Sequence, residues 1–325
     1  MKFKFFHALI IGATCFLLFS SCRPAGNSNP GGVSVNDAEG RGVKINDSSR
    51  IVSVGTATTE TIYALGLGNR LIGVDNSSGE YLQEAGGLPK VGPRNTLSAE
   101  GILALNPTLV IVTTDAGPPQ VIDQLKNTGV TVFALSANYT VEAVKEKVRA
   151  ISRSLGAEAK GAELESSIDR DMSEVGNLLA RTTSQPKVLF VGRGPNMPNA
   201  TMSGKGTTID EMIRLAGGTN PMDGFQGFRE MTDEAVINAA PDVILMTEKS
   251  FERSGGIDGA LKFPGVALTP AGKTRRIVAV SDMYFQGFGP SVGRAVRDLV
   301  YQLHPELSAT GNVKTPLPAS DGDRQ

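Results

Sequence analysis

The scarce aromatic side chains of this 325-residue chain gather in two copies of one tetrapeptide. Phe225-Gln-Gly-Phe228 and Phe285-Gln-Gly-Phe288 hold four of its 13 phenylalanines, and both lie in glycine-rich segments expected to form loops. Rings on exposed loops could form a binding surface for a flat or apolar ligand. They could equally anchor each loop to the core, and the sequence leaves both interpretations open.

A single tyrosine, Tyr81, follows a predicted buried strand over residues 71–74. Open α/β sheets bind ligands at the carboxyl ends of their strands, which is where Tyr81 is expected. A phenolate is a hard anionic ligand that suits ferric iron. Because the pKa of a tyrosine is normally about 10, the metal or a nearby cation such as Arg94 would have to stabilise the charge. Taken alone, Tyr81 is better explained as an ordinary surface tyrosine.

Other catalytic or metal chemistry has few candidate residues. The chain has 2 histidines and 2 cysteines, and only His304 lies far from the N-terminus, at the end of a predicted helix where the dipole favours it. Histidine metal sites, Ser-His-Asp triads and Cys-His dyads are therefore disfavoured. GxGxxG and Walker motifs are missing from the sequence. Nothing here demands an enzyme, which would need an acidic pair in a cleft.

The N-terminus resembles a lipoprotein signal peptide. Lys2 and Lys4 precede an apolar run over 5–19, and two serines lead into Cys22, the expected site of cleavage and acylation. An ordinary secretory signal is the alternative, and both place the protein outside the cytoplasm. Later apolar runs are too short to cross a bilayer, so the lipid attached to Cys22 would alone hold the protein at the membrane. The formal net charge of -1 argues against a nucleic-acid partner.

Two distant segments repeat one pattern. Residues 97–113 align without a gap on residues 231–247, and each has a capping Ser or Thr, a glutamate (Glu100 or Glu234), a short apolar helix, a proline and a buried strand. A fainter echo joins residues 58–66 to residues 207–217. This pattern predicts two similar α/β lobes with a ligand cleft between them.

Alternating strands and helices predict a parallel sheet in each half. Between the halves, residues 141–182 lack proline and repeat apolar residues at helical spacing, which predicts a long helical spine that could bend at Gly156 and Gly161. The expected strands cover 50–53, 71–74, 109–113, 130–135, 187–191, 243–246 and 277–280. The expected helices outside the spine cover 59–65, 98–105, 118–128, 209–216, 233–239 and 291–303. The expected domains are a signal peptide (1–21), a tether (22–47), an N-terminal lobe (48–140), the spine (141–183), a C-terminal lobe (184–309) and a disordered tail (310–325).

Together these features resemble the heme-binding branch of the ABC-transporter substrate-binding proteins of the helical-spine type, whose relatives bind cobalamin and ferric siderophores. The resemblance implies an α/β fold of class III, with two Rossmann-like lobes whose parallel sheets are joined by one long helix, and little hinge motion. It covers nearly the whole mature chain. Its most specific segments are 88–92, 97–107, 216–220, 240–244, 268–272 and 287–290.

The resemblance also implies roles for individual residues. In that family, one glutamate on each lobe docks to arginines of the permease, and Glu100 and Glu234 occupy those positions. A tyrosine after the second strand binds the heme iron, and Tyr81 matches it. Here Leu82 follows in place of the usual proline, and the segment is slightly longer than in the family.

We therefore expect a monomeric, lipid-anchored periplasmic receptor that binds heme as transported ligand rather than as catalytic cofactor. Its partner would be an ABC permease dimer with its ATPase. Alternatives are the same fold binding cobalamin or a ferric siderophore, an extracytoplasmic enzyme, or a sensor that lost transport. Tyr81 would bind the iron. Three further groups of residues are expected in the heme pocket. The macrocycle would contact the rings of Phe225, Phe228, Phe285 and Phe288, and its propionates would pair with Arg94, Arg193, Lys205 and Arg229. The reserve iron ligands are Met197, Met202 and Tyr284.

Overall fold

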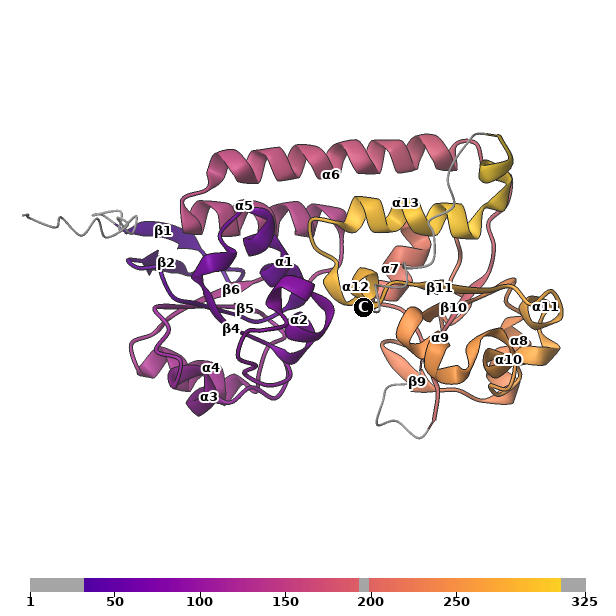
Figure 1. Cartoon of the computed structure of the whole chain (residues 1–325), viewed down its shortest axis with the longest axis horizontal. Helices are drawn as coiled ribbons and strands as arrows, with labels where there is room; N and C mark the ends of the chain where they lie inside the picture. The colour runs from indigo at the N-terminus through magenta and orange to yellow at the C-terminus, as the bar shows by residue number, and fades with distance from the viewer. Residues whose placement is uncertain (1–31, 193–198, 311–325) are drawn as a thin grey trace, which may run out of the picture.

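The apolar strands of each half assemble into a sheet of their own, giving two lobes that lie side by side beneath a layer of helices (Figure 1). The computed structural model describes residues 32–192 and 199–310. The expectations for the signal peptide, for Cys22, for Arg193 and Met197, and for the tail beyond residue 310 lie outside these residues. Among the residues that are described, no helix has both the length and the apolar character needed to cross a bilayer.

The N-terminal lobe contains the parallel sheet that the sequence predicts. Its strands pair in the order β4-β3-β5-β6, and every pair is parallel. All five residues of β5 are buried, as expected for a strand covered on both faces. The strands are β3 (Ile51–Ser53), β4 (Leu71–Val74), β5 (Leu109–Thr113) and β6 (Thr131–Leu135). The helices are α1 (Thr56–Ala64), α2 (Asn76–Tyr81), α3 (Ala99–Leu103) and α4 (Pro119–Asn127).

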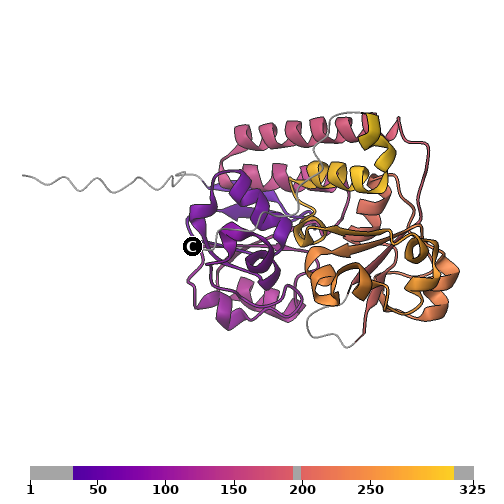
Figure 2. The same ribbon diagram turned by 45° about the vertical axis from the view of Figure 1, so that its right-hand side comes forward.

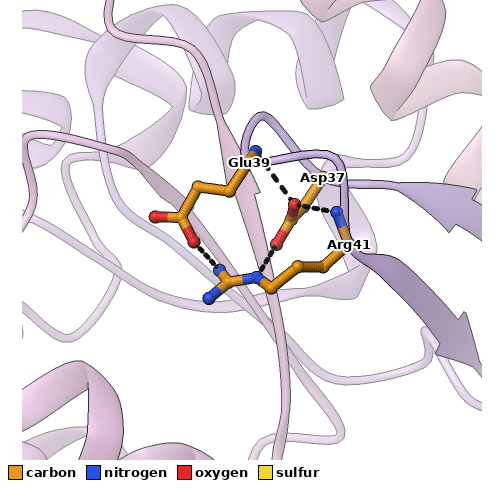
Figure 3. Close-up of polar contacts among 3 residues, drawn as sticks. All are labelled: Asp37, Glu39 and Arg41. Atoms are coloured by element: carbon orange, nitrogen blue, oxygen red, sulfur yellow. Dashed lines mark hydrogen bonds and ion pairs between the residues drawn. The ribbon is translucent and has the colours of Figure 1, made fainter.

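Part of the segment expected to be a tether is folded. Strands β1 (Val33–Asn36) and β2 (Gly42–Ile45) form an antiparallel hairpin, and the side chains of Val35 and Ile45 are buried in the core of the N-terminal lobe. The turn is closed by Asp37, which accepts hydrogen bonds from the Glu39 and Arg41 amides at 2.9 and 2.8 Å and from Arg41 Nε at 2.8 Å (Figure 3). The prediction of a tether over 22–47 is therefore wrong for residues 33–45.

The sheet of the C-terminal lobe is mixed, with strand order β11-β10-β7-β8-β9. The three predicted strands pair in parallel, but β8 and β9 extend the sheet antiparallel, so the expectation of a wholly parallel sheet is wrong here. The strands are β7 (Val188–Gly192), β8 (Thr201–Ser203), β9 (Phe228–Glu230), β10 (Val243–Thr247) and β11 (Ile277–Val280). The helices are α7 (Thr208–Leu215), α8 (Asp233–Ala239), α9 (Glu248–Ser254), α10 (Gly256–Ala260), α11 (Pro270–Lys273), α12 (Asp282–Gly287) and α13 (Val292–Leu303).

The spine segment forms two helices, α5 (Val141–Leu155) and α6 (Glu158–Leu179), rather than one continuous helix. Gly156 ends α5 in the left-handed conformation, with φ of 69°, which reverses the chain there. Helix α6, with 22 residues, packs against both α5 and α13 and so lies across both lobes (Figures 1 and 2). This helix is the long connection that the predicted architecture requires.

The sequence repeat corresponds to a structural repeat, α3–β5 in one lobe and α8–β10 in the other. Ser98 accepts a hydrogen bond from the Gly101 amide at 3.1 Å, and Thr232 accepts one from the Ala235 amide at 3.3 Å. Even the left-handed residues after the two helices coincide, because Asn106 (φ 49°) and Ala240 (φ 44°) hold equivalent positions.

Candidate functional site

A cavity of about 510 Å³ lies between the lobes. In the N-terminal lobe, the residues that line it follow the carboxyl ends of strands, with Gly55 after β3, Asp75 after β4, Asp115 after β5 and Tyr139 after β6. Open α/β sheets are expected to bind ligands at this edge. The other lining residues are Thr56, Ser77, Pro93, Arg94, Asn95, Gly206, Thr207, Thr208, Ile209, Gly227 and Phe228.

Two helices begin at this cavity, one from each lobe. Helix α1 starts directly after Gly55, whose φ is 109° and whose position lacks a capping side chain. Helix α7 starts after Thr207, which accepts a hydrogen bond from the Asp210 amide at 3.0 Å. Because helix N-termini carry partial positive charge and unpaired amide donors, both ends can bind acceptor groups of a ligand.

A buried chain of hydrogen bonds supports the N-lobe wall of the cavity. Asp75 Oδ1 accepts from the Gly55 amide at 2.9 Å and from the Ser78 hydroxyl. Thr59 Oγ1 lies 3.0 Å from Ser78 Oγ and 2.8 Å from Ser53 Oγ. Asp75 itself is 1% exposed, so its carboxyl group is held rigidly at the cavity.

Arg94 lines the cavity as expected, but its guanidinium already has a partner. Its Nη2 lies 3.2 Å from Asp115 Oδ2. The buried Lys147 lies near this pair and donates to the Asn138 carbonyl at 3.1 Å. Burial lowers the pKa of Lys147 to about 8, an effect that the charge of Asp115 opposes and that of Arg94 reinforces.

Tyr81 ends helix α2, one turn beyond the lining residue Ser77, and does not itself line the cavity. Lys249 of the C-terminal lobe places its Nζ 4.5 Å from the Tyr81 ring centroid and 3.1 Å from Glu80 Oε1. Burial first, then the charges of Glu80 and Asp282, raise the pKa of Tyr81 to about 12. The cation over this ring is thus Lys249, whereas Arg94, the expected one, is paired with Asp115.

The two aromatic tetrapeptides have different structures. Phe228 begins β9, lines the cavity and is 55% exposed, while Phe225 is half-buried with the Arg229 guanidinium 4.6 Å from its ring centroid. Phe288 is buried in the core of the C-terminal lobe and packs edge-on against Tyr139, with centroids 6.0 Å apart. The side chain of Phe285, in α12, lies outside the described part of the chain. Phe228 thus has the exposed ring of the first interpretation, although it lies in a strand rather than a loop, and Phe288 has the core-anchoring position of the second.

The remaining candidates divide by position. The exposed Lys205 and Arg229 are sequence neighbours of the lining residues Gly206 and Phe228, but neither lines the cavity itself. Tyr284 is not among the lining residues, and its hydroxyl donates to Asp298 Oδ2 at 2.6 Å. Met202, the reserve ligand in β8, is buried in the core of the C-terminal lobe.

Glu100 and Glu234 are exposed and occupy the first turns of α3 and α8. Figure 1 shows both helices on the side of the molecule that faces away from α6. A carboxylate in the first turn is favoured by the helix dipole, so each position is explained locally without a partner. Their placement on one side of the two lobes is also what a two-point docking surface requires.

A buried contact between the lobes lies beside the cavity. Glu60, in α1, is 9% exposed and accepts a hydrogen bond from the Ser291 amide, just before α13, at 2.9 Å. Its other oxygen, Oε2, has no hydrogen-bond partner among the described residues. Burial raises the pKa of Glu60, and the hydrogen bond from Ser291 opposes that rise. Helix α12 also packs against α1 and α2, so the lobes share a continuous interface.

Sequence reasoning missed three features of this site. Asp75 and Tyr139 follow β4 and β6, and the rule that identified Tyr81 from the end of a strand could have identified both. Glu60 carries no local signal, because its partner lies far along the chain in the other lobe. Among the described residues, no group of three or more histidine, cysteine, aspartate or glutamate side chains is placed to hold a metal ion.

Comparison with known proteins gives consistent results. The family described as periplasmic binding protein matches residues 51–283. The uncharacterized ABC transporter substrate-binding lipoprotein YvrC of Bacillus subtilis strain 168 is 29% identical over 84% of this chain and 86% of that protein. A vitamin B12-binding protein of Vibrio parahaemolyticus is 28% identical over 63% of this chain and 73% of that protein. The periplasmic heme-binding protein RhuT from Roseiflexus sp. RS-1 has 39% identity and a TM-score of 0.74, over 80% of this chain and 100% of that one.

Proposed function

Because this chain belongs to the periplasmic binding protein family, we propose that its cavity binds heme and that the protein delivers heme to an ABC importer. The chain is an extracytoplasmic substrate-binding protein of an ABC transporter. Its relatives are binding proteins of transporters rather than enzymes. The identity of the guest, the residues that hold it and the lipid anchor are the parts we propose.

The observation that carries the heme proposal is the interlobe cavity with Phe228 on its wall. The Phe228 ring is 55% exposed beside a cavity of about 510 Å³, and an aromatic ring on a cavity wall suits a flat, apolar guest. Tyr139 adds a second ring to the lining. The likeness to RhuT, a heme-binding protein, supports the same guest.

Basic residues adjoining the lining residues could bind the carboxylate groups of such a guest. Lys205 and Arg229 flank lining residues of the C-terminal lobe, and the N-terminus of α7 begins between them in sequence. Arginine binds a carboxylate through two parallel hydrogen bonds, which makes Arg229 the better partner of the two for a propionate. We propose Arg94 and Arg193 as additional partners and Met197 as a reserve ligand.

Tyr81 remains our proposed iron ligand. Its raised pKa means that the proton must be replaced by ferric iron, because burial and the carboxylates around it disfavour a free phenolate. The Lys249 ammonium over the ring would have to withdraw as the guest enters. Tyr139 is the competing candidate, because it lines the cavity directly.

Titration with hemin, followed by absorption spectroscopy, tests the guest and the ligand together. We expect the wild-type protein to bind hemin with a phenolate-to-iron charge-transfer band that Tyr81→Phe loses. Tyr139→Phe, a matched removal of one hydroxyl from the same region, should keep the band. The opposite pattern would assign the iron to Tyr139, and failure of the wild-type protein to bind hemin would refute the heme proposal.

Cobalamin is the second candidate guest. The similarity to a vitamin B12-binding protein favours it, and so does Asp75, whose unpartnered carboxylate oxygen suits the amide donors of a corrinoid better than a propionate. Titration with cyanocobalamin under the same conditions distinguishes the two, since binding of the corrinoid alone would replace heme in this proposal.

We propose that Glu100 and Glu234 dock to basic patches on the permease dimer. Reversing either charge, in Glu100→Lys or Glu234→Lys, should lower uptake about tenfold, the effect of losing one charge-assisted hydrogen bond. Hemin affinity should not change, because both residues lie outside the cavity. The control is Glu163→Lys, an exposed residue of α6 on the opposite side, which should leave uptake unchanged. Uptake that survives both reversals would contradict this docking surface.

We also propose that acylated Cys22 tethers the protein, as a monomer, to the membrane. The name of the relative YvrC, a lipoprotein, supports the anchor. The tether is then shorter than the sequence suggested, because the chain is folded from Val33 onward. Binding to the permease would occur within the short reach of this linker.

A further inference from the structure

Besides Glu60 Oε2, three buried oxygen atoms of the N-terminal lobe have no hydrogen-bond partner among the described residues. They are Thr58 Oγ1, Asp75 Oδ2 and Thr113 Oγ1. Their side chains belong to residues that are 0%, 1% and 5% exposed. Buried polar groups are almost always paired in folded proteins, so these oxygens call for a partner that the described chain itself does not supply.

These oxygens lie around Gly55, with Asp75 lining the cavity and Thr58 and Thr113 directly behind its wall. A Cβ atom at Gly55 would lie 3.6 Å from Thr58 Oγ1 and 3.8 Å from Thr113 Oγ1, and the Gly55 amide donates to the Asp75 carboxyl at 2.9 Å. Gly55 and Asp75 both line the cavity. Glycine thus leaves open the space beside these oxygens that any side chain would begin to fill.

The chemistry of the three atoms restricts what can bind there. An ionised carboxylate only accepts hydrogen bonds, and Asp75 Oδ1 already has two donors, the Gly55 amide and the Ser78 hydroxyl. Asp75 Oδ2 therefore requires a donor from the guest. The two threonine hydroxyls can donate or accept, and the first amides of α1 donate. A guest carboxylate would offer no donor and would bring like charge to Asp75.

We infer that this part of the cavity wall, lined by Gly55 and Asp75 with the Thr58 and Thr113 hydroxyls behind it, is a subsite for an uncharged guest group that donates and accepts hydrogen bonds, either a primary carboxamide or a protonated carboxylic acid. The inference deepens the proposed function and rests on it, because it assumes a macrocycle held between the lobes. The charged end of the guest would then lie toward the C-terminal lobe, where Lys205 and Arg229 adjoin lining residues in sequence. The subsite would select among macrocycles according to the side groups that they carry.

The test compares hemin with hemin whose two propionates are converted to primary carboxamides. The variant is Asp75→Asn, in which the oxygen that accepts from Gly55 and Ser78 is retained and only the free oxygen becomes an amino group. That group donates to a carboxylate and no longer accepts from an amide. We expect the ratio of the two dissociation constants to shift about tenfold in favour of hemin. Asp123→Asn, the same change at an exposed site on α4, should leave the ratio unchanged.

A second variant keeps the inference testable if Asp75→Asn fails to fold. Thr113→Val keeps the shape of the side chain and removes one unpaired hydroxyl without changing charge. We expect it to weaken binding of the carboxamide form about fivefold while the protein folds normally. Unchanged ratios in Asp75→Asn together with unchanged binding in Thr113→Val would overturn the subsite.

The outcomes separate this inference from the heme proposal. If hemin binds, and neither Asp75→Asn changes the ratio nor Thr113→Val weakens binding of the carboxamide form, the subsite fails and heme stands. If neither hemin form binds but cyanocobalamin does, and Asp75→Asn weakens it, heme fails and the subsite stands with a corrinoid carboxamide. If none of the three probes binds, both fail.

Discussion

Replacing Gly289 with alanine is expected to lower the free energy of unfolding by about 2 to 3 kcal/mol and to hold the lobes apart. Gly289 lies directly against α1 of the other lobe. A methyl group there would overlap Glu60 Oε2 and come within 3.2 Å of the Ala57 Cα atom. Glu60 is buried and hydrogen-bonded to Ser291, so it cannot swing away, and the backbone of α1 would have to retreat.

Urea unfolding and small-angle scattering measure the two parts of this result, the loss of stability and the larger radius of gyration. Gly176→Ala in α6 is the control, because a methyl group there meets no atom within 4 Å, and it should raise stability by up to about 1 kcal/mol. The double variant Glu60→Ala/Gly289→Ala tests the cause, since removing the carboxyl group makes room for the methyl group. Strictly additive effects in this cycle would contradict the proposed overlap.

The second large effect is expected from Lys147→Met, which should raise the free energy of unfolding at pH 7 by about 2 kcal/mol. Burial lowers the pKa of Lys147 from its ordinary value of 10.5 to about 8, so folding disfavours its charge. Each pKa unit corresponds to about 1.4 kcal/mol. Leaving the Asn138 carbonyl without its 3.1 Å donor offsets part of the gain, by about 1 kcal/mol.

This stabilisation depends on pH in a defined window. Between pH of about 8 and 10.5 the unfolded chain binds the Lys147 proton and the folded chain does not, so the stability of the wild-type protein rises with pH there. The advantage of the methionine variant should therefore be largest below pH 8 and should shrink as pH approaches 10.5. Lys126→Met, at an exposed position of α4, should change stability by less than about 0.5 kcal/mol. A gain that is independent of pH would exclude the buried charge as its cause.

Much of the fold could be predicted because local and tertiary signals agree. The strand over 109–113 is apolar at every position except Thr113, and it lies buried on both faces between β3 and β6. The caps Ser98 and Thr232 mark helices in equivalent positions, and the repeat predicted both lobes from them. In these segments the apolar pattern predicts the strand and the capping hydrogen bond predicts the start of the helix, so the local sequence is sufficient to identify each element.

The errors come from segments whose structure depends on distant partners. Residues 33–45 have the alternation of a hairpin, but their glycine, aspartate and asparagine content resembles a linker, and only packing of Val35 and Ile45 on the N-lobe core orders them. The identical Phe-Gln-Gly-Phe segments differ for the same reason. Phe228 pairs at a sheet edge and remains exposed, whereas Phe288 is drawn into a core beside Tyr139.

The candidate site was only partly predictable. The carboxyl edge of the N-lobe sheet identified the right region, but the cavity there is lined by Asp75 and Tyr139 rather than by Tyr81. Tyr81 follows β4 within a helix, α2, which turns its ring toward Lys249 of the other lobe. The interface between the two lobes decides which residues surround a side chain such as Tyr81. That interface depends on segments far apart in the sequence, so no single segment predicts it.

If Glu100 and Glu234 form the docking surface proposed above, the structural repeat leaves two possible orientations on a symmetric permease. Both glutamates lie in the first turns of equivalent helices, so a two-fold symmetric partner would present the same pair of charges after a half turn, and charge alone would accept both orientations. Strands β8 and β9 belong only to the C-terminal sheet, and within the described chain they give the two ends different outlines. Steric fit, rather than electrostatics, would then decide which way round the molecule sits.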